Sequence, residues 1–151
     1  MNLFFFGTLL DQEVRAIVFG HPLAVRPAVL RGFRRPHVAG RHYPMLMARP
    51  GGRVAGLLAE GIDDETVRRL RLYEGWEYQL HPFRLETATG PVEAHVFICP
   101  PGIEAAEPEW RLDRWQLRHK RVFLRHLRRQ SERVLDQETW HQHPPRLWPG
   151  S

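Results

Sequence analysis

The sequence predicts a single small α+β domain, with a mixed β-barrel or curved sheet and flanking helices. Three observations favour this class. The chain has 151 residues, which is close to the commonest size of one domain. Hydrophobic residues make up 42% and charged residues 26%, as in globular proteins and unlike disordered chains. Short strand patterns are interrupted by two helical patterns and followed by a third, without the regular alternation of a doubly wound fold.

A strand and a helix are expected first. Leu3 to Phe6 is a continuous apolar run ended by Gly7, which is typical of a strand buried on both faces. Asp11 can cap a helix, and valine and isoleucine recur behind it at helical spacing until Gly20. We therefore expect a helix over residues 12–19.

Two further strands are expected next along the chain. Segments 25–33 and 53–60 carry Val, Leu, Phe and Ala and are bounded by Gly and Pro, which is a strand signature. The stretch 36–52 is instead rich in Pro, Gly, Arg and His. It predicts loops, with one short strand around residues 45–48.

A second helix and a hairpin follow. Asp63 or Asp64 can cap a helix that runs to about Tyr73. Segments 80–88 and 92–99 then read as the two strands of a hairpin. The Thr-Gly-Pro triplet between them makes the turn, and apolar residues of the second segment share one face.

The positive charge of the chain is concentrated in one segment. Residues 111–135 hold nine basic and two acidic residues, a net charge of +7 against +5 for the whole chain. An apolar stripe at helical spacing lies opposite most of the arginines, so we expect one basic amphipathic helix after an acidic, Pro-rich linker over residues 100–109. The stripe consists of Leu112, Trp115, Val122, Phe123, Leu127 and Val134, with His119 and His126 as core histidines within it.

The basic face leaves two interpretations open. The simpler one is a solvated face on a docked helix, and the other is a footprint for nucleic acid or a membrane surface. We expect the solvated face, and hence neither a nucleic-acid nor a membrane partner. The domain is expected to span residues 1–135, and residues 136–151 to form an irregular Pro-rich tail.

The cysteine and histidine content argues against several kinds of site. The single cysteine, Cys99, cannot form an internal disulfide, which fits a reducing compartment, and the apolar run near residue 3 is too short for a membrane span. We expect a cytoplasmic protein. Among the nine histidines only His141 and His143 are close in sequence. They have no nearby carboxylate or cysteine, so no metal site is expected.

The first candidate functional segment lies between the first strand and the first helix. Glycine lets the backbone turn tightly, and the free N–H groups of such a turn and helix start can bind a carboxylate or an oxyanion. The same pattern is also typical of a simple turn, and both interpretations stay open. The segment consists of Phe6, Gly7, Thr8, Leu9, Leu10 and Asp11.

The second candidate is Glu74. It follows Val67 by seven positions and Leu70 by four, so a helix through all three turns its carboxyl toward the buried face. Burial among neighbouring aromatic residues, together with the negative end of the helix dipole, would raise the pKa of that carboxyl and suit it to general acid and base catalysis. Alternatively, the helix ends one residue earlier and Glu74 turns into solvent.

Both candidates occur together in one known family. The sequence resembles the AIG2-like branch of the γ-glutamylcyclotransferase family over about residues 2–128. The first shared motif is Tyr-Gly-Ser/Thr-Leu, here at residues 6–9, and the second is Leu-Asp-x-Tyr/Phe/Val-Glu-Gly, here at residues 70–75. Other shared positions are Leu30, Gly32, Phe33, Tyr43, Pro44, Tyr78, Trp110, Leu112, Trp115, His119 and Lys120.

The resemblance implies a small barrel-like α and β fold whose pocket holds a γ-glutamyl group. In the family, the α-amine of that group attacks its own γ-carbonyl, so that an amine is released and 5-oxoproline remains. Glu74 would accept and return the proton, and the loop from Phe6 to Asp11 would bind the glutamyl portion, with Tyr43 and Tyr78 as further substrate-binding residues. The partner is then a small γ-glutamyl substrate, and no metal or organic cofactor is required.

Three positions depart from the family pattern. Phe6 stands where the family usually has Tyr, Arg71 where it has Asp, and Leu80 where an Arg often follows the Tyr. Arg71 would lower the pKa of Glu74 if the two side chains were close. Two other functions are weighed beside catalysis: binding of an acidic metabolite without turnover, and nucleic-acid binding through the helix 111–135.

Overall fold

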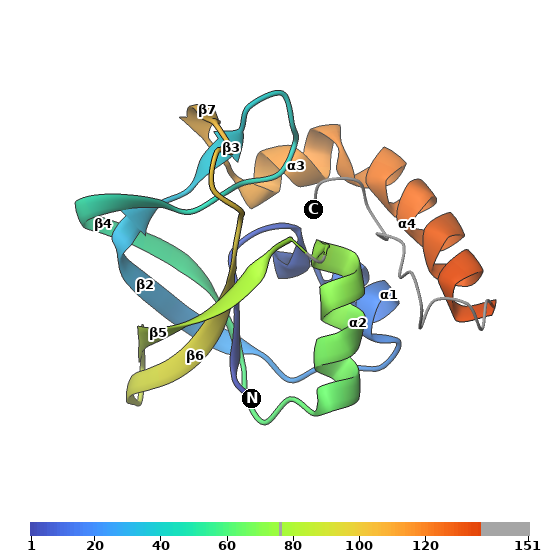
Figure 1. Ribbon diagram of the computed structural model, residues 1–151, viewed down its shortest axis with the longest axis horizontal. Coiled ribbons are helices and arrows are strands. Elements are labelled where there is room, and N and C mark those ends of the chain that lie inside the picture. The colour runs from blue at the N-terminus through green and yellow to red at the C-terminus, as the bar shows by residue number, and fades with distance from the viewer. Residues whose placement is uncertain (76, 137–151) are drawn as a thin grey trace.

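Five strands of the chain close into a barrel (Figure 1). The computed structural model describes residues 1–75 and 77–136. Around the barrel the order is β1 (Leu3–Phe5), β4 (Met47–Ala59), β2 (Arg26–Arg34), β5 (Gln79–Thr87) and β6 (Gly90–Ile98). Neighbouring strands are antiparallel except for β6 and β1, which close the barrel in parallel. The predicted class, a small mixed barrel with flanking helices, is confirmed.

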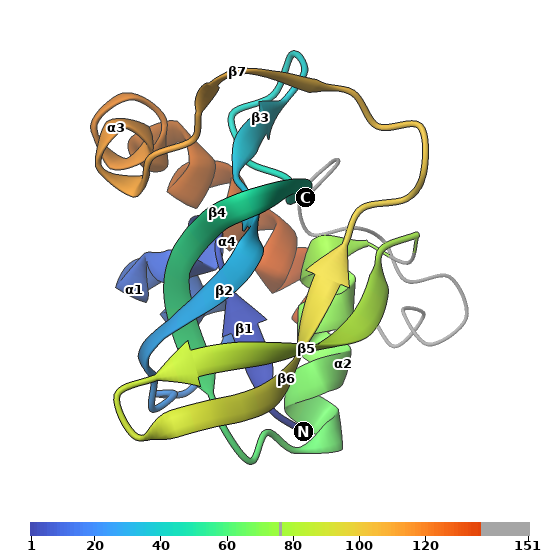
Figure 2. The same cartoon turned by 90° about the vertical axis from the view of Figure 1, so that its left-hand side faces the viewer.

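A two-stranded sheet lies beside one end of the barrel (Figure 2). It pairs β3 (Pro36–Val38) with β7 (Ala105–Glu109) in antiparallel orientation. The loop predicted over residues 36–52 and the linker predicted over 100–109 are therefore wrong at these positions. In the described part of the chain each of these strands pairs with one other strand, and β3 adds a single bridge from His37 to Pro44. Such edge strands tolerate the prolines that suggested a loop.

β4 is longer than its apolar pattern. The sequence predicts a strand from residue 53, but β4 begins at Met47. Its first residues are mostly exposed, and they pair with Phe33 and Arg34 of β2 beyond an irregularity in register. A Cβ on Gly52 would lie 2.5 Å from the backbone oxygen of Phe33, so this close approach requires glycine. Backbone pairing, and not burial, makes this part a strand.

The two helices predicted before the hairpin are confirmed. α1 (Gln12–Phe19) begins behind Asp11, whose carboxylate accepts hydrogen bonds from two backbone N–H groups of the first turn. It ends at Gly20, which has a φ of 71° and so adopts the left-handed conformation that glycine permits. α2 (Asp64–Glu74) is capped in the same way by Asp63.

The hairpin is also confirmed, although its turn comes earlier than predicted. The strands expected over residues 80–88 and 92–99 are β5 and β6. Thr87 and Gly90 pair directly, and Gly90 has a φ of 112°. The turn therefore consists of residues 88–89 and is shorter than the predicted Thr-Gly-Pro turn at residues 89–91.

The basic segment forms two helices and not the single one predicted over residues 111–135. α3 (Leu112–Arg118) and α4 (Lys120–Asp136) are separated by His119, whose φ of −127° is not helical. The predicted stripe is confirmed at Trp115, Phe123 and Leu127, which are buried. Val122 is instead 52% exposed, and Leu124 is buried in its place.

Further predictions about this segment have mixed outcomes. His119 is half-buried, whereas His126 is exposed, so the prediction that His126 belongs to the core is wrong. The side chain of Val134 and the predicted tail from residue 137 onward lie outside the described residues. Within the part of the chain that the structure describes, no helix is long and apolar enough to cross a bilayer.

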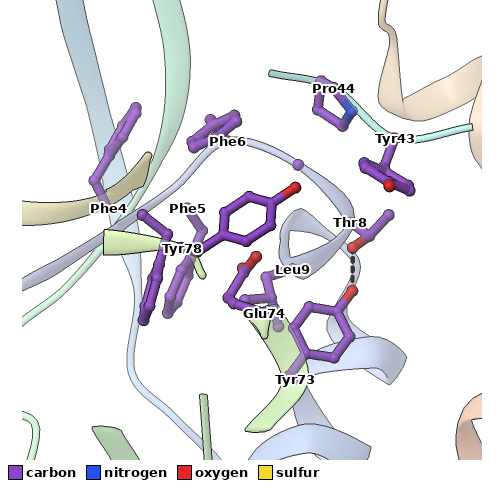
Figure 3. A pocket seen from close by; sticks show the side chains of 12 residues that line it. Phe4, Phe5, Phe6, Thr8, Leu9, Tyr43, Pro44, Tyr73, Glu74 and Tyr78 are labelled. Carbon is purple, nitrogen blue, oxygen red and sulfur yellow. Dashed lines mark hydrogen bonds between the residues drawn. The ribbon is translucent and has the colours of Figure 1, made fainter. Parts of the chain in front are cut away.

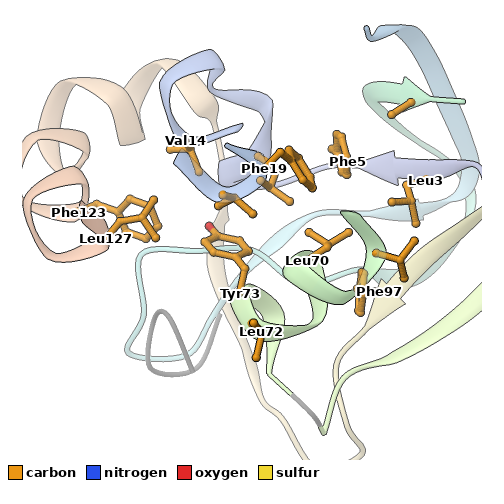
Figure 4. Packing of buried hydrophobic residues seen from close by; sticks show 14 of the residues in the cluster. Leu3, Phe5, Val14, Phe19, Leu70, Leu72, Tyr73, Phe97, Phe123 and Leu127 are labelled. Carbon is orange, nitrogen blue, oxygen red and sulfur yellow. The ribbon is translucent and has the colours of Figure 1, made fainter. Parts of the chain in front are cut away.

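Two apolar clusters join the barrel and the helices. One fills the barrel and includes Phe4, Leu30 and Leu85. The larger one lies between β1 and the helices α1, α2 and α4 (Figure 4). Tyr73 belongs to this larger cluster, so the last turn of α2 is held against α1 and α4. The next residue, Glu74, is thereby placed beside the end of β1.

Candidate active site

A small pocket opens at the end of β1, where the chain turns toward α1 (Figure 3). Its volume is about 50 Å³, well below the roughly 300–1,000 Å³ of pockets for drug-sized ligands. Segments that lie far apart in the sequence meet here. The lining residues are Phe4, Phe5, Phe6, Gly7, Thr8, Leu9, Tyr43, Pro44, Tyr73, Glu74, Tyr78 and Phe97.

Glu74 places a carboxyl group in this pocket. It is the last residue of α2, on the helix face of the buried Val67 and Leu70, and its side chain points into the pocket beside the ring of Tyr78 (Figure 3). Burial raises the pKa of this carboxyl to about 8. No hydrogen bond or ion pair from a described residue reaches it. A carboxyl with this pKa can both accept and donate a proton near neutral pH.

Two phenol groups flank the carboxyl. The hydroxyl of Tyr73 is buried and forms a hydrogen bond with the hydroxyl of Thr8. Burial, and secondly the charge of Glu74, raises the pKa of Tyr73, and the same two causes raise the pKa of Tyr78. Both phenols therefore keep their protons throughout the physiological pH range. They can donate hydrogen bonds but do not compete with Glu74 as a base.

Two arginines hold the turn between β1 and α1. Nη1 of Arg35 donates a hydrogen bond to the carbonyl oxygen of Phe6 at 2.9 Å. Nη1 of Arg15 donates to the last two carbonyl oxygens of the 3₁₀ helix η1 (Thr8–Leu10), each at 2.9 Å. The backbone N–H groups of residues 7–9 donate to no described residue. They are therefore available to a negatively charged oxygen in the pocket.

The glycine of this turn lies close to Pro44. A Cβ on Gly7 would lie 3.3 Å from two ring carbons of Pro44, which is closer than an ordinary van der Waals contact. The backbone oxygen of Tyr43 accepts a hydrogen bond of 3.0 Å from the N–H of Val38, at the end of β3. The short sheet thus anchors the Tyr-Pro dipeptide that covers the turn.

Asp11 has a structural position outside the pocket. Its carboxylate is 1% exposed and, besides capping α1, accepts from Nζ of Lys120 at 2.8 Å and from Nε2 of Gln116 at 3.0 Å. Burial acts to raise the pKa of Asp11, but these hydrogen bonds outweigh burial and lower that pKa. Asp11 therefore joins the turn to α3 and α4.

Arg71 lies against an aromatic ring. Its guanidinium carbon is 5.9 Å from the ring centre of Phe97, a cation–π distance. Burial is the cause that shifts the pKa of Glu74, and it raises that pKa. The condition under which Arg71 would lower the pKa of Glu74 is therefore not met. Trp76, an aromatic neighbour in sequence, lies outside the described residues.

Most of the predicted site residues lie together, and two do not. Leu10 packs against the larger core cluster, and Asp11 is turned toward α3 and α4. Tyr73 was not singled out from the sequence, although its place directly before Glu74 in the second motif is a usable signal. The two arginines that hold the turn have no such signal, because they act on backbone carbonyls from other elements. The predicted residues that line the pocket are Phe6, Gly7, Thr8, Leu9, Tyr43, Glu74 and Tyr78.

Other reactive groups are poorly placed for chemistry. Cys99 is half-buried, and burial raises the pKa of its thiol, which disfavours the nucleophilic thiolate. Within residues 1–75 and 77–136, no group of three or more His, Cys, Asp or Glu side chains is arranged to hold a metal ion. Among the described residues, Glu74 is therefore the carboxyl group that lines this pocket.

The sequence is similar to a defined family of proteins. The family described as gamma-glutamyl cyclotransferase, AIG2-like, matches residues 3–117. Protein AIG2 C of Arabidopsis thaliana is 25% identical over 139 residues, which cover 87% of this chain and 81% of that protein. AIG2-like protein A of the same plant is 26% identical over 129 residues, which cover 82% and 76% respectively.

Solved structures share the fold. A solution structure of an Arabidopsis thaliana protein has a TM-score of 0.61 at 22% identity and covers 95% of this chain and 84% of its own. A structure described as gamma-glutamyl cyclotransferase has a TM-score of 0.59 at 18% identity, with coverage of 71% and 70%. An AIG2-like protein from Mus musculus has a TM-score of 0.55 at 18% identity, with coverage of 73% and 87%. The barrel with its flanking helices is common to all three.

Proposed function

Since the chain belongs to the gamma-glutamyl cyclotransferase, AIG2-like family, we propose that it converts a γ-glutamyl amine or peptide into 5-oxoproline and a free amine. The observation that carries this proposal is the carboxyl of Glu74, with a pKa of about 8, in a pocket shared with the turn after β1. The pocket is small enough to select a compact acyl group and too small for a nucleotide.

Glu74 acts as the base in the first step. The α-amino group of the substrate has to lose a proton before its nitrogen can attack, and such groups have pKa values of roughly 8. Because the pKa of Glu74 is also about 8, the proton moves between the two groups at little free-energy cost. The freed amine attacks the γ-carbonyl carbon of the same substrate, and a five-membered ring closes.

Glu74 acts as the acid in the second step. As the bond between the γ-carbon and the departing nitrogen breaks, the protonated carboxyl donates its proton to that nitrogen. The second proton of the attacking nitrogen leaves with the released amine, so Glu74 returns to its starting form. Between the two steps the γ-carbonyl oxygen is negatively charged, and it accepts hydrogen bonds from the N–H groups of residues 7–9, which donate to no described residue. The reaction needs no metal or organic cofactor.

A nucleic-acid role is less well supported. The basic face of α4 is partly used within the protein, because Lys120 binds Asp11 and Glu13 at 2.8 and 2.9 Å, and Arg128 lies 3.6 Å from Glu13. These pairs fit a docked helix with a solvated outer face. We place the reaction in the cytoplasm, where a chain with one cysteine stays reduced.

The test is release of 5-oxoproline from matched substrates. Wild type, Glu74→Gln and the control Glu104→Gln, which alters an exposed carboxylate, are incubated with γ-glutamyl-alanine, γ-glutamyl-methylamide and γ-glutamyl-alanyl-alanine. We expect turnover by wild type and the control, and a loss of roughly 10²- to 10⁴-fold in Glu74→Gln, the range for general acid–base catalysis.

Two results contradict the proposal. Equal rates in wild type and Glu74→Gln would remove the carboxyl from the mechanism. Absence of product from every substrate, combined with thermal stabilisation by glutamate-like compounds, would identify a binding module without turnover.

A further inference from the structure

A wider groove adjoins the Glu74 pocket. It has a volume of about 560 Å³, within the usual range for ligand sites. Thr8 and Tyr43 line both the pocket and the groove, so the two lie side by side at these residues. One wall of the groove is the segment around residues 40–43, and the other is formed by α3 and α4.

The groove is positively charged. Arg41 lies on one wall and Arg118 on the other, and among the described residues no aspartate or glutamate lines the groove. Neither guanidinium forms an ion pair with a residue in the described part of the chain. By comparison, Arg34 at the edge of the short sheet is paired with Glu107 and Glu109. Two unpaired guanidinium groups across a groove favour a ligand that carries a carboxylate.

The groove also offers a hydrogen-bond acceptor. Oε1 of Gln130 is buried in the groove wall and has no hydrogen-bond partner among the described residues. A buried polar atom without a partner carries a free-energy cost that a ligand N–H group removes. A peptide bond supplies such a group, whereas a simple carboxylic acid does not.

The floor between these groups is flat and apolar. The rings of His42 and His119 stack with their centres 3.6 Å apart, and Trp115 and Phe123 lie beside them. Burial, and secondly the neighbouring His42, lowers the pKa of His119, which disfavours a positive charge on that ring. The floor can contact the backbone and short side chains of an extended peptide.

We propose that this groove binds the leaving portion of the substrate, and that this portion is a peptide with a free carboxylate. The proposal rests on the function proposed above, because the scissile bond then lies at Thr8 and Tyr43, where the pocket meets the groove. The peptide N–H donates to Gln130, and the carboxylate pairs with Arg41 and Arg118. A γ-glutamyl peptide is thereby preferred over the γ-glutamyl conjugate of an uncharged amine.

The test compares a free acid with its amide in two ways. First, kcat/KM for 5-oxoproline release is measured with γ-glutamyl-alanyl-alanine and with its C-terminal amide. Second, Kd is measured by isothermal titration for N-acetyl-alanyl-alanine and its C-terminal amide, using Glu74→Gln as the host so that turnover plays no part. The variants are Arg118→Gln, the double variant Arg41→Gln with Arg118→Gln, and the control Arg121→Gln, whose side chain lies outside the groove.

We expect wild type to prefer the acid by about fivefold, the effect of one well-placed exposed ion pair. Arg118→Gln reduces this preference, the double variant abolishes it, and Arg121→Gln retains it. The same order is expected for Kd. Gln130→Leu weakens the binding of the acid and of the amide to the same extent, because it removes the acceptor for the peptide N–H.

Equal kcat/KM values of wild type for the acid and the amide overturn the proposal. A preference for the acid that survives in the double variant overturns it as well. The Kd measurement distinguishes failure of the groove proposal from failure of the proposed cyclotransferase function. If no substrate yields 5-oxoproline but the acid still binds better through the two arginines, the cyclotransferase reaction is refuted while the peptide site stands.

Discussion

Replacing Glu74 by glutamine tests the burial of its carboxyl through protein stability alone. The pKa of this carboxyl rises from 4.5 to about 8 in the folded protein. Each pKa unit corresponds to about 1.4 kcal/mol, so the ionised carboxyl destabilises the folded state by at most about 5 kcal/mol. Glutamine has the same shape and never ionises, so the variant is free of this destabilisation.

The sign of the pH dependence follows from proton binding. Between pH 4.5 and about 8, Glu74 is ionised in the unfolded chain but protonated in the folded protein. The folded state therefore binds more protons, and its stability falls as pH rises through this window. We expect Glu74→Gln and wild type to be similarly stable near pH 4.5. The variant is more stable by up to about 5 kcal/mol at pH 9.

The assay is urea unfolding followed by tryptophan fluorescence at intervals from pH 5 to 9. Other titrating groups contribute equally to both proteins and cancel in the difference. Glu104→Gln, at an exposed position, is the control and leaves the wild-type curve nearly unchanged. A difference that does not vary with pH, or a variant that is less stable at pH 9, would place the carboxyl in solvent and refute the reasoning.

Three further predictions concern the site and its support. The rate kcat/KM for 5-oxoproline release passes through a maximum near pH 8, because the mechanism needs both the base form of Glu74 and the protonated amine of the substrate, and each has a pKa of about 8; a flat profile from pH 6 to 9 argues against Glu74 as the base. Lys120→Met lowers the free energy of unfolding by about 3 kcal/mol in urea titrations, because it leaves the carboxylate of Asp11 buried without its cation; no loss means that water or another residue takes over the pairing. Tyr73→Phe lowers stability by about 1 kcal/mol, since Thr8 loses a buried hydrogen-bond partner, and equal stability by differential scanning calorimetry contradicts this bond.

Local signals were sufficient for the elements that carry the site. Asp11 and Gly20 mark the ends of α1 through capping chemistry that acts within a few residues. The position of Glu74 followed from its spacing to Val67 and Leu70, because helix geometry fixes which side chains share a face. Helix phase and one glycine turn thus predict the two parts of the pocket, Glu74 and the turn after β1, from local sequence alone.

Features that depend on distant segments were missed. β3 and β7 pair residues that lie far apart in the chain, and neither has an apolar alternation of its own. Arg15 and Arg35 donate hydrogen bonds to backbone carbonyls. Every residue has such a carbonyl, so the sequence does not indicate which one is the partner. The break at His119 also lacks a local signal, since neither proline nor glycine occurs there. Beyond that residue Val122 and His126 are exposed against the prediction, whereas Phe123 and Leu127 are buried as predicted.

The bonds of Asp11 set an order on synthesis of the protein. Asp11 emerges from the ribosome long before Gln116, from which it is separated by 105 positions, and Lys120 follows later still. Until then the nascent turn after β1 has a carboxylate but neither of these two donors. The bonds of the turn to the start of α1 and to Arg15 are local, whereas these two are long-range contacts, which form more slowly than a local helix. The carboxylate is fully paired only after α4 has been translated.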